Sequence, residues 1–285
     1  MAVAPNAYLI GAQKAGTTLL AALLDQSPDV CVSNPKEPQY LTGQYDRGPD
    51  WYAACFSNPD AKVLLDASTT YSFLRPAHAL GDADAPGITA PVPQRIADLN
   101  PEARLIYILR DPVARAVSAY KHRLRYGDAP KGPVSMTDVL DADPMIELAS
   151  KYADQIDRYL EVFDIERFLF IDFKDLTADP AAVSAVAAQH LGIAPPPPPP
   201  ASKQDGAKHS AHRATGLGRA LKSLRGRAPW VETGLRRAVP QALQKKLIAP
   251  FLKQDIAVEI TGFEEVAGRF ELDRARVKTI TGLDI

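Results

Sequence analysis

YLIGAQKAGTTLL, residues 8–20, decides the fold class of this 285-residue chain. The apolar run Tyr8 to Ile10 predicts a buried strand, and the leucine pattern from Thr17 to Asp25 predicts a helix. Between them lies a turn bounded by Gly11 and Gly16. Such a turn lets backbone N–H groups approach a phosphate, and the helix N-terminus adds a partial positive charge. The stretch therefore predicts an anion-binding loop at the start of an α/β fold.

The rest of the chain repeats this strand–helix alternation. Further strands are expected at residues 30–32, 63–65, 105–109 and 168–171, and further helices at 93–99, 111–125, 145–163 and 179–192. Asp-Pro pairs begin three of these helices, because aspartate caps a helix and proline suits its first position. Repeated alternation predicts a central parallel sheet flanked by helices on both faces.

A run of six prolines, residues 195–200, divides the chain. It predicts a stiff connector between an α/β core at 1–194 and a basic, mainly helical C-terminal region at 201–285 that packs on the core. Residues 201–250 hold eleven Lys and Arg against two acids, although the whole chain has a formal net charge of −1. Such a segment suits a solvated helical face, an anionic ligand or a membrane surface.

The overall composition is that of a globular protein, with 46% hydrophobic and 24% charged residues. The two cysteines, Cys31 and Cys55, lack metal-ligand spacing and are expected to be reduced, buried thiols. The N-terminus has no charged segment before its short apolar run, and no apolar run approaches about 18 residues. We therefore expect a cytoplasmic protein, and no nucleic-acid partner.

The loop differs from a nucleotide-kinase loop in the position of its lysine. The spacing of Gly11 and Gly16 matches a Walker A loop, but Thr17 stands where the Walker lysine would be, and the lysine is Lys14. The Lys14 ammonium would lie near the bridging oxygen of a bound anhydride. A plain glycine turn with a surface lysine is one alternative. An Mg²⁺-dependent kinase or NTPase is another, since residues 63–66 could form a Walker B strand, but the missing lysine counts against it.

Three stretches, YLIGAQKAGTTLL, NPKEPQYL (34–41) and LIYILRDPVARAVSAYKH (105–122), together resemble the successive motifs of the sulfotransferases that use 3′-phosphoadenosine 5′-phosphosulfate (PAPS). The bacterial and heparan-sulfate branches are the closest match, and the similarity spans roughly residues 7–193. The resemblance implies a parallel-sheet fold, PAPS as donor, 3′-phosphoadenosine 5′-phosphate as product, and no metal. It assigns the phosphosulfate end of PAPS to the loop residues Gln13, Lys14, Ala15, Gly16, Thr17 and Thr18.

A second anion site is expected at Arg110, which ends the strongest predicted strand. Ligands bind at the carboxyl ends of parallel strands, and Ser118 lies two helical turns beyond the N-cap Asp111. Arginine offers a bidentate fork and serine a hydroxyl, and the resemblance assigns both to the 3′-phosphate of PAPS. Alternatively, Arg110 pairs locally with Asp111 and Ser118 is merely exposed. We expect Arg115 to be a helix-surface ion-pair residue and His122 to be a possible acceptor contact.

The acceptor side is expected after the second strand. The resemblance to the heparan-sulfate branch makes Glu37 the general base, and Lys36 would neutralise sulfuryl oxygens. A surface ion pair between Lys36 and Glu37 is the alternative. Other residues that could act as the base are His78, His122 and Asp66. The residues expected to contact the substrate are Lys36, Tyr40, Asp66 and His122.

Two departures and one ambiguity limit the resemblance. Ala67 and Thr69 stand where the heparan-sulfate branch has lysine and proline, so a glycosaminoglycan acceptor is not implied. Residues 150–152 resemble the family's next motif, but Ser150 stands where glycine is common. Tyr152 of that motif has an alternative interpretation as an ordinary aromatic residue of the core.

A cofactor clamp is expected from Lys208, Arg213, Arg225 and Arg227. The alternative is that the basic helix lies on an anionic membrane.

The sequence as a whole predicts a PAPS-dependent sulfotransferase acting on a carbohydrate, glycolipid or small natural-product hydroxyl. A P-loop nucleotide kinase and a non-catalytic nucleotide- or membrane-binding module are the alternatives. The acceptor and the oligomeric state are left open.

Overall fold

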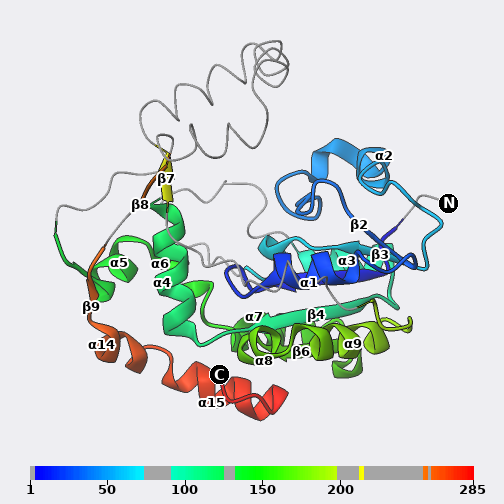
Figure 1. The fold of residues 1–285 in the computed structure, drawn as a ribbon. Coiled ribbons are helices and arrows are strands. Elements are labelled where there is room, and N and C mark those ends of the chain that lie inside the picture. The colour runs from blue at the N-terminus through cyan, green and yellow to red at the C-terminus, as the bar shows by residue number, and fades with distance from the viewer. Residues whose placement is uncertain (1–3, 74–90, 125–131, 198–211, 215–252, 256–257) are drawn as a thin grey trace, which may run out of the picture.

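A five-stranded parallel sheet forms the centre of the computed structural model, which describes residues 4–73, 91–124, 132–197, 212–214, 253–255 and 258–285 (Figure 1). Its strand order is β2-β3-β1-β4-β6, and every neighbouring pair is parallel. The strands are β1 (Ala7–Gly11), β2 (Val30–Val32), β3 (Val63–Asp66), β4 (Arg104–Leu109) and β6 (Phe168–Asp172). Each lies where the sequence predicts it, and the α/β fold is confirmed. Because all five run the same way, their carboxyl ends share one edge.

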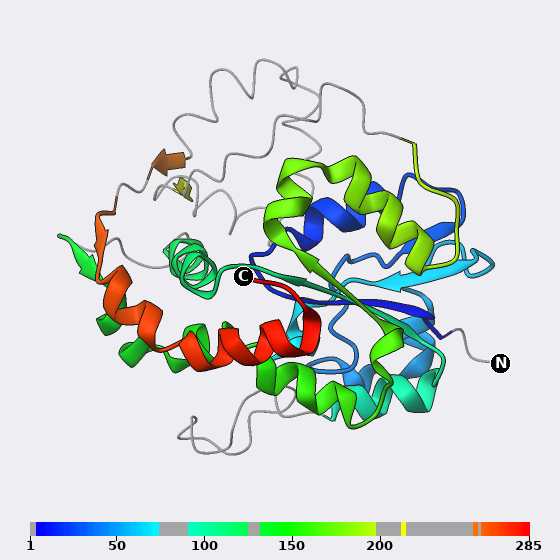
Figure 2. The same cartoon turned by 90° about the horizontal axis from the view of Figure 1, so that it is seen from below.

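Helices cover both faces of the sheet, as Figure 2 shows. One face carries α1 (Thr17–Leu24), α8 (Phe173–Ala178) and α9 (Pro180–His190), and the other carries α3 (Val92–Leu99) and α7 (Ala153–Leu160). All five residues of β1 are buried, as are five of the six in β4. Burial on both faces explains why these strands read as continuous apolar runs rather than as alternating ones. Cys31 and Cys55 are free and buried, as predicted.

Two of the three Asp-Pro pairs cap their helices as predicted. Asp111 accepts a 2.6 Å hydrogen bond from Ala114 N at the start of α4 (Pro112–Arg123). Asp179 accepts a 2.9 Å bond from Ala182 N at the start of α9. The third pair begins the short helix α6 (Pro144–Leu148) without a side-chain cap.

The prediction of one helix across 145–163 is wrong, because α6 ends at Leu148 and α7 begins at Ala153. Side chains from distant elements bind the chain on both sides of the break. Arg115 donates to Ile146 O at 2.5 Å and to Ser150 Oγ at 2.6 Å. The Asp273 carboxylate accepts the N–H groups of the first residues of the next helix. Helical periodicity cannot reveal such tertiary partners.

The C-terminal part of the described chain adds two helices, α14 (Phe263–Gly268) and α15 (Glu271–Thr281). With α4, α6 and α5 (Met136–Ala142), α14 forms a second apolar cluster, and α15 lies beside α7 (Figure 2). Short strands pair as β5 (Val134–Ser135) with β9 (Ile260–Thr261), and β7 (His212–Ala214) with β8 (Lys253–Asp255). Among the described residues, no helix combines the length and the apolar character that a membrane span requires.

Several short elements were not predicted from the sequence. They are the helix α2 (Gly48–Ala53), α5, α8, and the 3-10 turns η1 (Tyr45–Arg47), η2 (Thr69–Ser72) and η4 (Ile165–Arg167). Each is no longer than seven residues, too short for a clear helical period. Of these, η2 matters most, because it lies at the carboxyl edge of the sheet.

Candidate active site

The loop after β1 is held in place by the neighbouring strand β4 and by the start of the helix α4 that follows β4 in the chain. Three successive loop residues each bond to β4 or to the segment just after it: Ala12 N to Ile108 O at 2.8 Å, Arg115 Nη1 to Gln13 O at 3.4 Å, and Arg110 Nη1 to Lys14 O at 2.8 Å. The loop carbonyls are thus turned toward two arginines. These three bonds attach the backbone of the loop to the chain from β4 to α4.

The backbone of the loop has the geometry that an anion requires. Gly16, with φ +85°, precedes α1, and a Cβ there would lie 2.9 Å from Leu176 Cδ2. Lys14 also has a positive φ, +73°, which residues other than glycine rarely adopt and which is often found at functional sites. In the described structure no side chain caps α1. The first N–H groups of α1, at Thr17 and Thr18, have no acceptor within the helix and are available to a phosphate.

The turn η2 presses against the first residue of the loop. A Cβ on Gly11 would lie 2.5 Å from Ser72 Oγ and 2.9 Å from Tyr107 Cε2, so only glycine fits there. The Tyr71 carbonyl, also in η2, accepts a 2.9 Å bond from the Tyr159 hydroxyl of α7. The bond from Tyr159 thus holds η2 to α7, and Ser72 places η2 against the start of the loop after β1.

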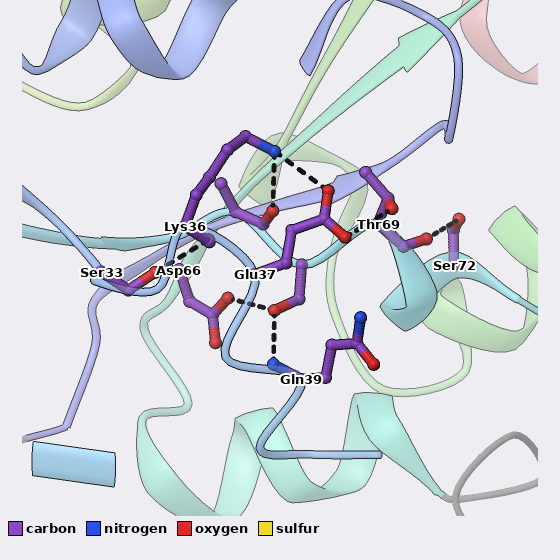
Figure 3. Close-up of polar contacts among 9 residues, drawn as sticks. Ser33, Lys36, Glu37, Gln39, Asp66, Thr69 and Ser72 are labelled. Atoms are coloured by element: carbon purple, nitrogen blue, oxygen red, sulfur yellow. Dashed lines mark hydrogen bonds and ion pairs between the residues drawn. The ribbon is translucent and has the colours of Figure 1, made fainter. Parts of the chain in front are cut away.

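Glu37 belongs to the loop that follows β2, and its side chain points toward the loop that follows β3 (Figure 3). Its Oε2 accepts a 3.2 Å bond from Thr69 Oγ1, and its Oε1 accepts a 3.1 Å bond from Lys36 Nζ. Lys36 Nζ also donates to Ala67 O at 3.3 Å. The Glu37 side chain is 33% exposed, so the carboxylate is oriented yet still reachable. The ion pair with Lys36 exists, but it is half-buried and joined to η2, unlike a simple surface pair.

Arg110 is a half-buried cation at the end of β4. Its guanidinium lies 4.5 Å from the centroid of the Phe173 ring, and burial lowers the pKa of the group. None of the ion pairs formed by described residues includes Arg110. The alternative pair with Asp111 is not formed, because the Asp111 carboxylate accepts from Ala114 N and from Arg274. A cation desolvated in this way favours an anionic ligand.

Arg115 is not the surface residue that the sequence led us to expect. It is completely buried, and its guanidinium donates to Ser150 Oγ, Ile146 O and Gln13 O. The expectation is wrong because the inner face of α4 packs between the loop and α6. The small residues Ala116 and Ala119, buried on the same face, are the feature of the sequence that could have indicated this.

Ser118 and His122 follow along the same helix. Ser118 lies three residues after Arg115, on the side of α4 that meets the phosphate loop, and it is half-buried. A cavity of about 140 Å³ opens next to the loop and is lined by Gln13, Phe73, Arg115 and His122, among others. His122 therefore faces a space that adjoins the loop. The roles expected for Ser118 and His122 stay predictions.

Two of the expected substrate contacts lie in the core. Asp66 is fully buried, and its carboxylate accepts from the hydroxyls of Tyr52 (2.6 Å), Ser68 (2.7 Å) and Tyr71 (2.7 Å). Burial raises the pKa of Asp66 to about 6, although these hydrogen bonds act in the opposite direction. Tyr40 is 4% exposed and stacks on Tyr52 with a centroid distance of 4.2 Å. This contradicts the expectation, because neither residue offers surface to an acceptor.

The proposed clamp cannot be located. Lys208, Arg225 and Arg227, and the alternative base His78, lie outside the described residues, and of Arg213 only the backbone, in β7, is described. The clamp and the membrane alternative stay predictions.

Fold and site together define a class: an α/β protein whose glycine-bounded loop, suited to a phosphate, follows the central strand of a parallel sheet. The residues present fit a nucleotide with more than one anionic group, since the helix N-terminus, Lys14 and Arg110 lie close together along the loop.

A family model described as "Sulfotransferase domain" matches residues 4–212. The chain therefore belongs to the sulfotransferase family, whose members are enzymes that transfer sulfate. This membership favours the predicted class over the kinase and the non-catalytic module.

Relatives and solved structures agree with the family. The chain is 32% identical over 208 residues to human bifunctional heparan sulfate N-deacetylase/N-sulfotransferase 3, covering 67% of this chain and 22% of that protein. It is 28% identical over 204 residues to mouse heparan sulfate glucosamine 3-O-sulfotransferase 6, covering 66% of this chain and 52% of that one. It thus matches at most about half of these relatives. A sulfotransferase from Alicyclobacillus acidocaldarius has the same fold (TM-score 0.60, 22% identity, 99% and 97% coverage).

Proposed function

We propose that this protein transfers a sulfuryl group from PAPS to a hydroxyl of an acceptor. The observation that carries the proposal is Arg110, a half-buried cation without a carboxylate partner in the described structure, joined to the phosphate loop by its 2.8 Å bond to Lys14 O. A nucleoside triphosphate carries its phosphates in one chain, which the loop alone could hold. A second fixed cation beside the loop supports a nucleotide with an additional phosphate, as in PAPS.

The donor side would be formed by the loop and β4. The loop residues 13–18 would hold the phosphosulfate through their backbone N–H groups, except that of Ala15, which donates to Ala12 O at 3.0 Å. Arg110 and Ser118 would hold the 3′-phosphate. PAPS supplies a sulfuryl group on a phosphate leaving group. The Lys14 ammonium would neutralise the negative charge that grows on that phosphate, which is the kind of stabilisation that has the largest effect on rate.

The acceptor side would depend on Glu37. As general base, its carboxylate would take the proton of the acceptor hydroxyl while the oxygen attacks sulfur. The bonds from Thr69 and Lys36 fix both carboxylate oxygens, so the group is oriented before the acceptor arrives. Lys36, on the same loop, would help to neutralise the sulfuryl oxygens.

We propose a carbohydrate hydroxyl as the first acceptor class to test. A heparan sulfate N-sulfotransferase and a heparan sulfate 3-O-sulfotransferase are among the relatives. Both support a glycan, and the second supports transfer to oxygen. The cavity beside Gln13 and His122 offers polar side chains to such an acceptor. Phenols, glycolipids and small natural products belong in the same screen.

Calorimetric titration tests the donor. We expect 3′-phosphoadenosine 5′-phosphate to bind with micromolar affinity, and ATP with Mg²⁺ to bind far more weakly. Arg110→Ala should weaken the first titration strongly. A preference for ATP and Mg²⁺ would overturn the proposal and restore the kinase alternative. Transfer from labelled PAPS to the acceptor panel then tests the reaction itself.

A further inference from the structure

The C-terminal helix α15 lies outside the residues matched by the family model, yet it contacts the Arg110 segment by two routes. Both begin at neighbouring residues of its first turn, Asp273 and Arg274. Neither the sequence motifs nor the proposed reaction gives this helix a role.

The first route passes through Tyr152. The Asp273 carboxylate accepts the backbone N–H groups of Tyr152 and Ala153, each at 2.9 Å, and so caps α7 from a distant part of the chain. Asp273 is only 9% exposed and Tyr152 is fully buried. The Tyr152 hydroxyl in turn donates a 2.9 Å bond to Arg110 O. Asp273 therefore fixes the residue that fixes the Arg110 backbone.

The second route passes through Asp111. Arg274 donates to one Asp111 carboxylate oxygen, while the other accepts Ala114 N at 2.6 Å and begins α4. Asp111 is the neighbour of Arg110, so the two routes hold adjacent residues at the end of β4. Both routes start on one helical turn of α15.

The side chain of Arg110 is constrained as well, by its bond to Lys14 O and its contact with the Phe173 ring. With backbone and guanidinium both fixed before binding, little conformational freedom is lost when an anion arrives. We propose that Asp273 and Tyr152 are positioning residues for Arg110, and that α15 thereby makes the site selective for a nucleotide carrying a 3′-phosphate. This inference rests on the proposed function, because it assumes that Arg110 binds that phosphate.

The same helix supplies a matched control. Arg276 pairs with Asp154 and Asp157 on the exposed side of α7, and so also holds α15 against α7. It has no contact with Tyr152, Arg110 or Asp111 among its described contacts. A purely structural role of α15 would make Arg276 comparable to Asp273, whereas a positioning role separates them.

The experiment measures the affinity for 3′-phosphoadenosine 5′-phosphate divided by the affinity for adenosine 5′-phosphate, which lacks the 3′-phosphate. Calorimetry on the full chain gives this ratio for wild type, Tyr152→Phe, Asp273→Asn, Arg276→Ala and Arg110→Ala. We expect Tyr152→Phe and Asp273→Asn to lower it by about threefold to tenfold, the effect of one lost hydrogen bond. Arg276→Ala should leave it within about twofold, and Arg110→Ala should remove most of the preference.

Each outcome has a definite meaning. Equal losses of both nucleotides, or an unchanged ratio in Tyr152→Phe, would overturn the inference while leaving the proposed function standing. A wild-type protein without preference for the 3′-phosphate would overturn the proposed function and this inference with it. Tyr152→Phe decides the matter even if Asp273→Asn does not fold, because it removes a single hydroxyl and keeps the buried ring.

Discussion

The two sides of the candidate site are built differently. On the proposed donor side, buried or half-buried arginines and a tyrosine bond to backbone carbonyls of the loop and of Arg110. On the proposed acceptor side, Glu37 is held by the side chains of Lys36 and Thr69, and both members of the ion pair remain partly exposed. The donor side is thus part of the fold, while the acceptor side is attached to it by a loop. Changes at Glu37 should therefore alter rate alone, whereas changes to the arginines bonded to the loop should also alter binding or stability.

Glu37→Gln should give the largest effect. Loss of a general base typically lowers turnover by about 10²–10⁴-fold, and the amide keeps the size and one oxygen of the side chain. Affinity for 3′-phosphoadenosine 5′-phosphate should not change, since the loop and Arg110 are untouched. Steady-state rates with calorimetry in parallel check this, with the exposed Glu166→Gln as control. Near-normal turnover would remove Glu37 from catalysis.

Lys14→Ala should come next, on the donor side. Removing a group that stabilises developing charge costs about 10²–10³ in turnover. The loop should persist, because its tie to Arg110 uses the Lys14 carbonyl rather than the ammonium. Single-turnover rates and thermal melting of the variant, compared with the exposed Lys121→Ala, test the prediction. A large fall in melting temperature would instead indicate a structural lysine.

Arg115→Met should destabilise the fold. It removes a fully buried guanidinium and leaves Ile146 O and Ser150 Oγ without this donor, which we expect to lower the free energy of unfolding by about 2–4 kcal/mol. Arg123→Met, two turns further along α4, breaks a partly exposed pair with Asp143 and should cost less than about 1 kcal/mol. Urea unfolding of both variants makes the comparison. Equal effects would show that burial of Arg115 has no energetic consequence.

Asp66 should give the smallest effect, visible as a pH dependence. Its folded pKa of about 6 lies above the ordinary value of 3.8, so the folded state binds the proton more tightly than the unfolded chain does. The stability that this protonation contributes is complete below about pH 4 and is lost as the pH rises through about 6; it amounts to at most about 3 kcal/mol. Urea midpoints from pH 4 to 7 should fall less steeply in Asp66→Asn than in wild type. Parallel curves would contradict the raised pKa.

The donor side could be predicted largely from the sequence, and the acceptor side only in part. The loop from Gly11 to Thr18 and the strand before Arg110 are local patterns, since periodicity and glycine placement act within a few residues. Glu37 was reached only through the resemblance, and its bond to Thr69 joins two loops 32 residues apart. Asp66 and Tyr40 have the polar groups of site residues, and their burial among aromatic rings depends on how α2 packs.

The sequence by itself therefore determined the parallel sheet, the turn between Gly11 and Gly16 and the two Asp-capped helices, because strand burial, turn formation and capping depend on neighbouring residues. Only the tertiary structure decided where the helix after Asp143 breaks, that Arg115 is buried, and that α15 reaches Tyr152 and Asp111. Each of these depends on a side chain bonding across more than 30 residues. Such a bond forms only after the elements have packed together, so a pattern of neighbouring residues in the sequence cannot predict it.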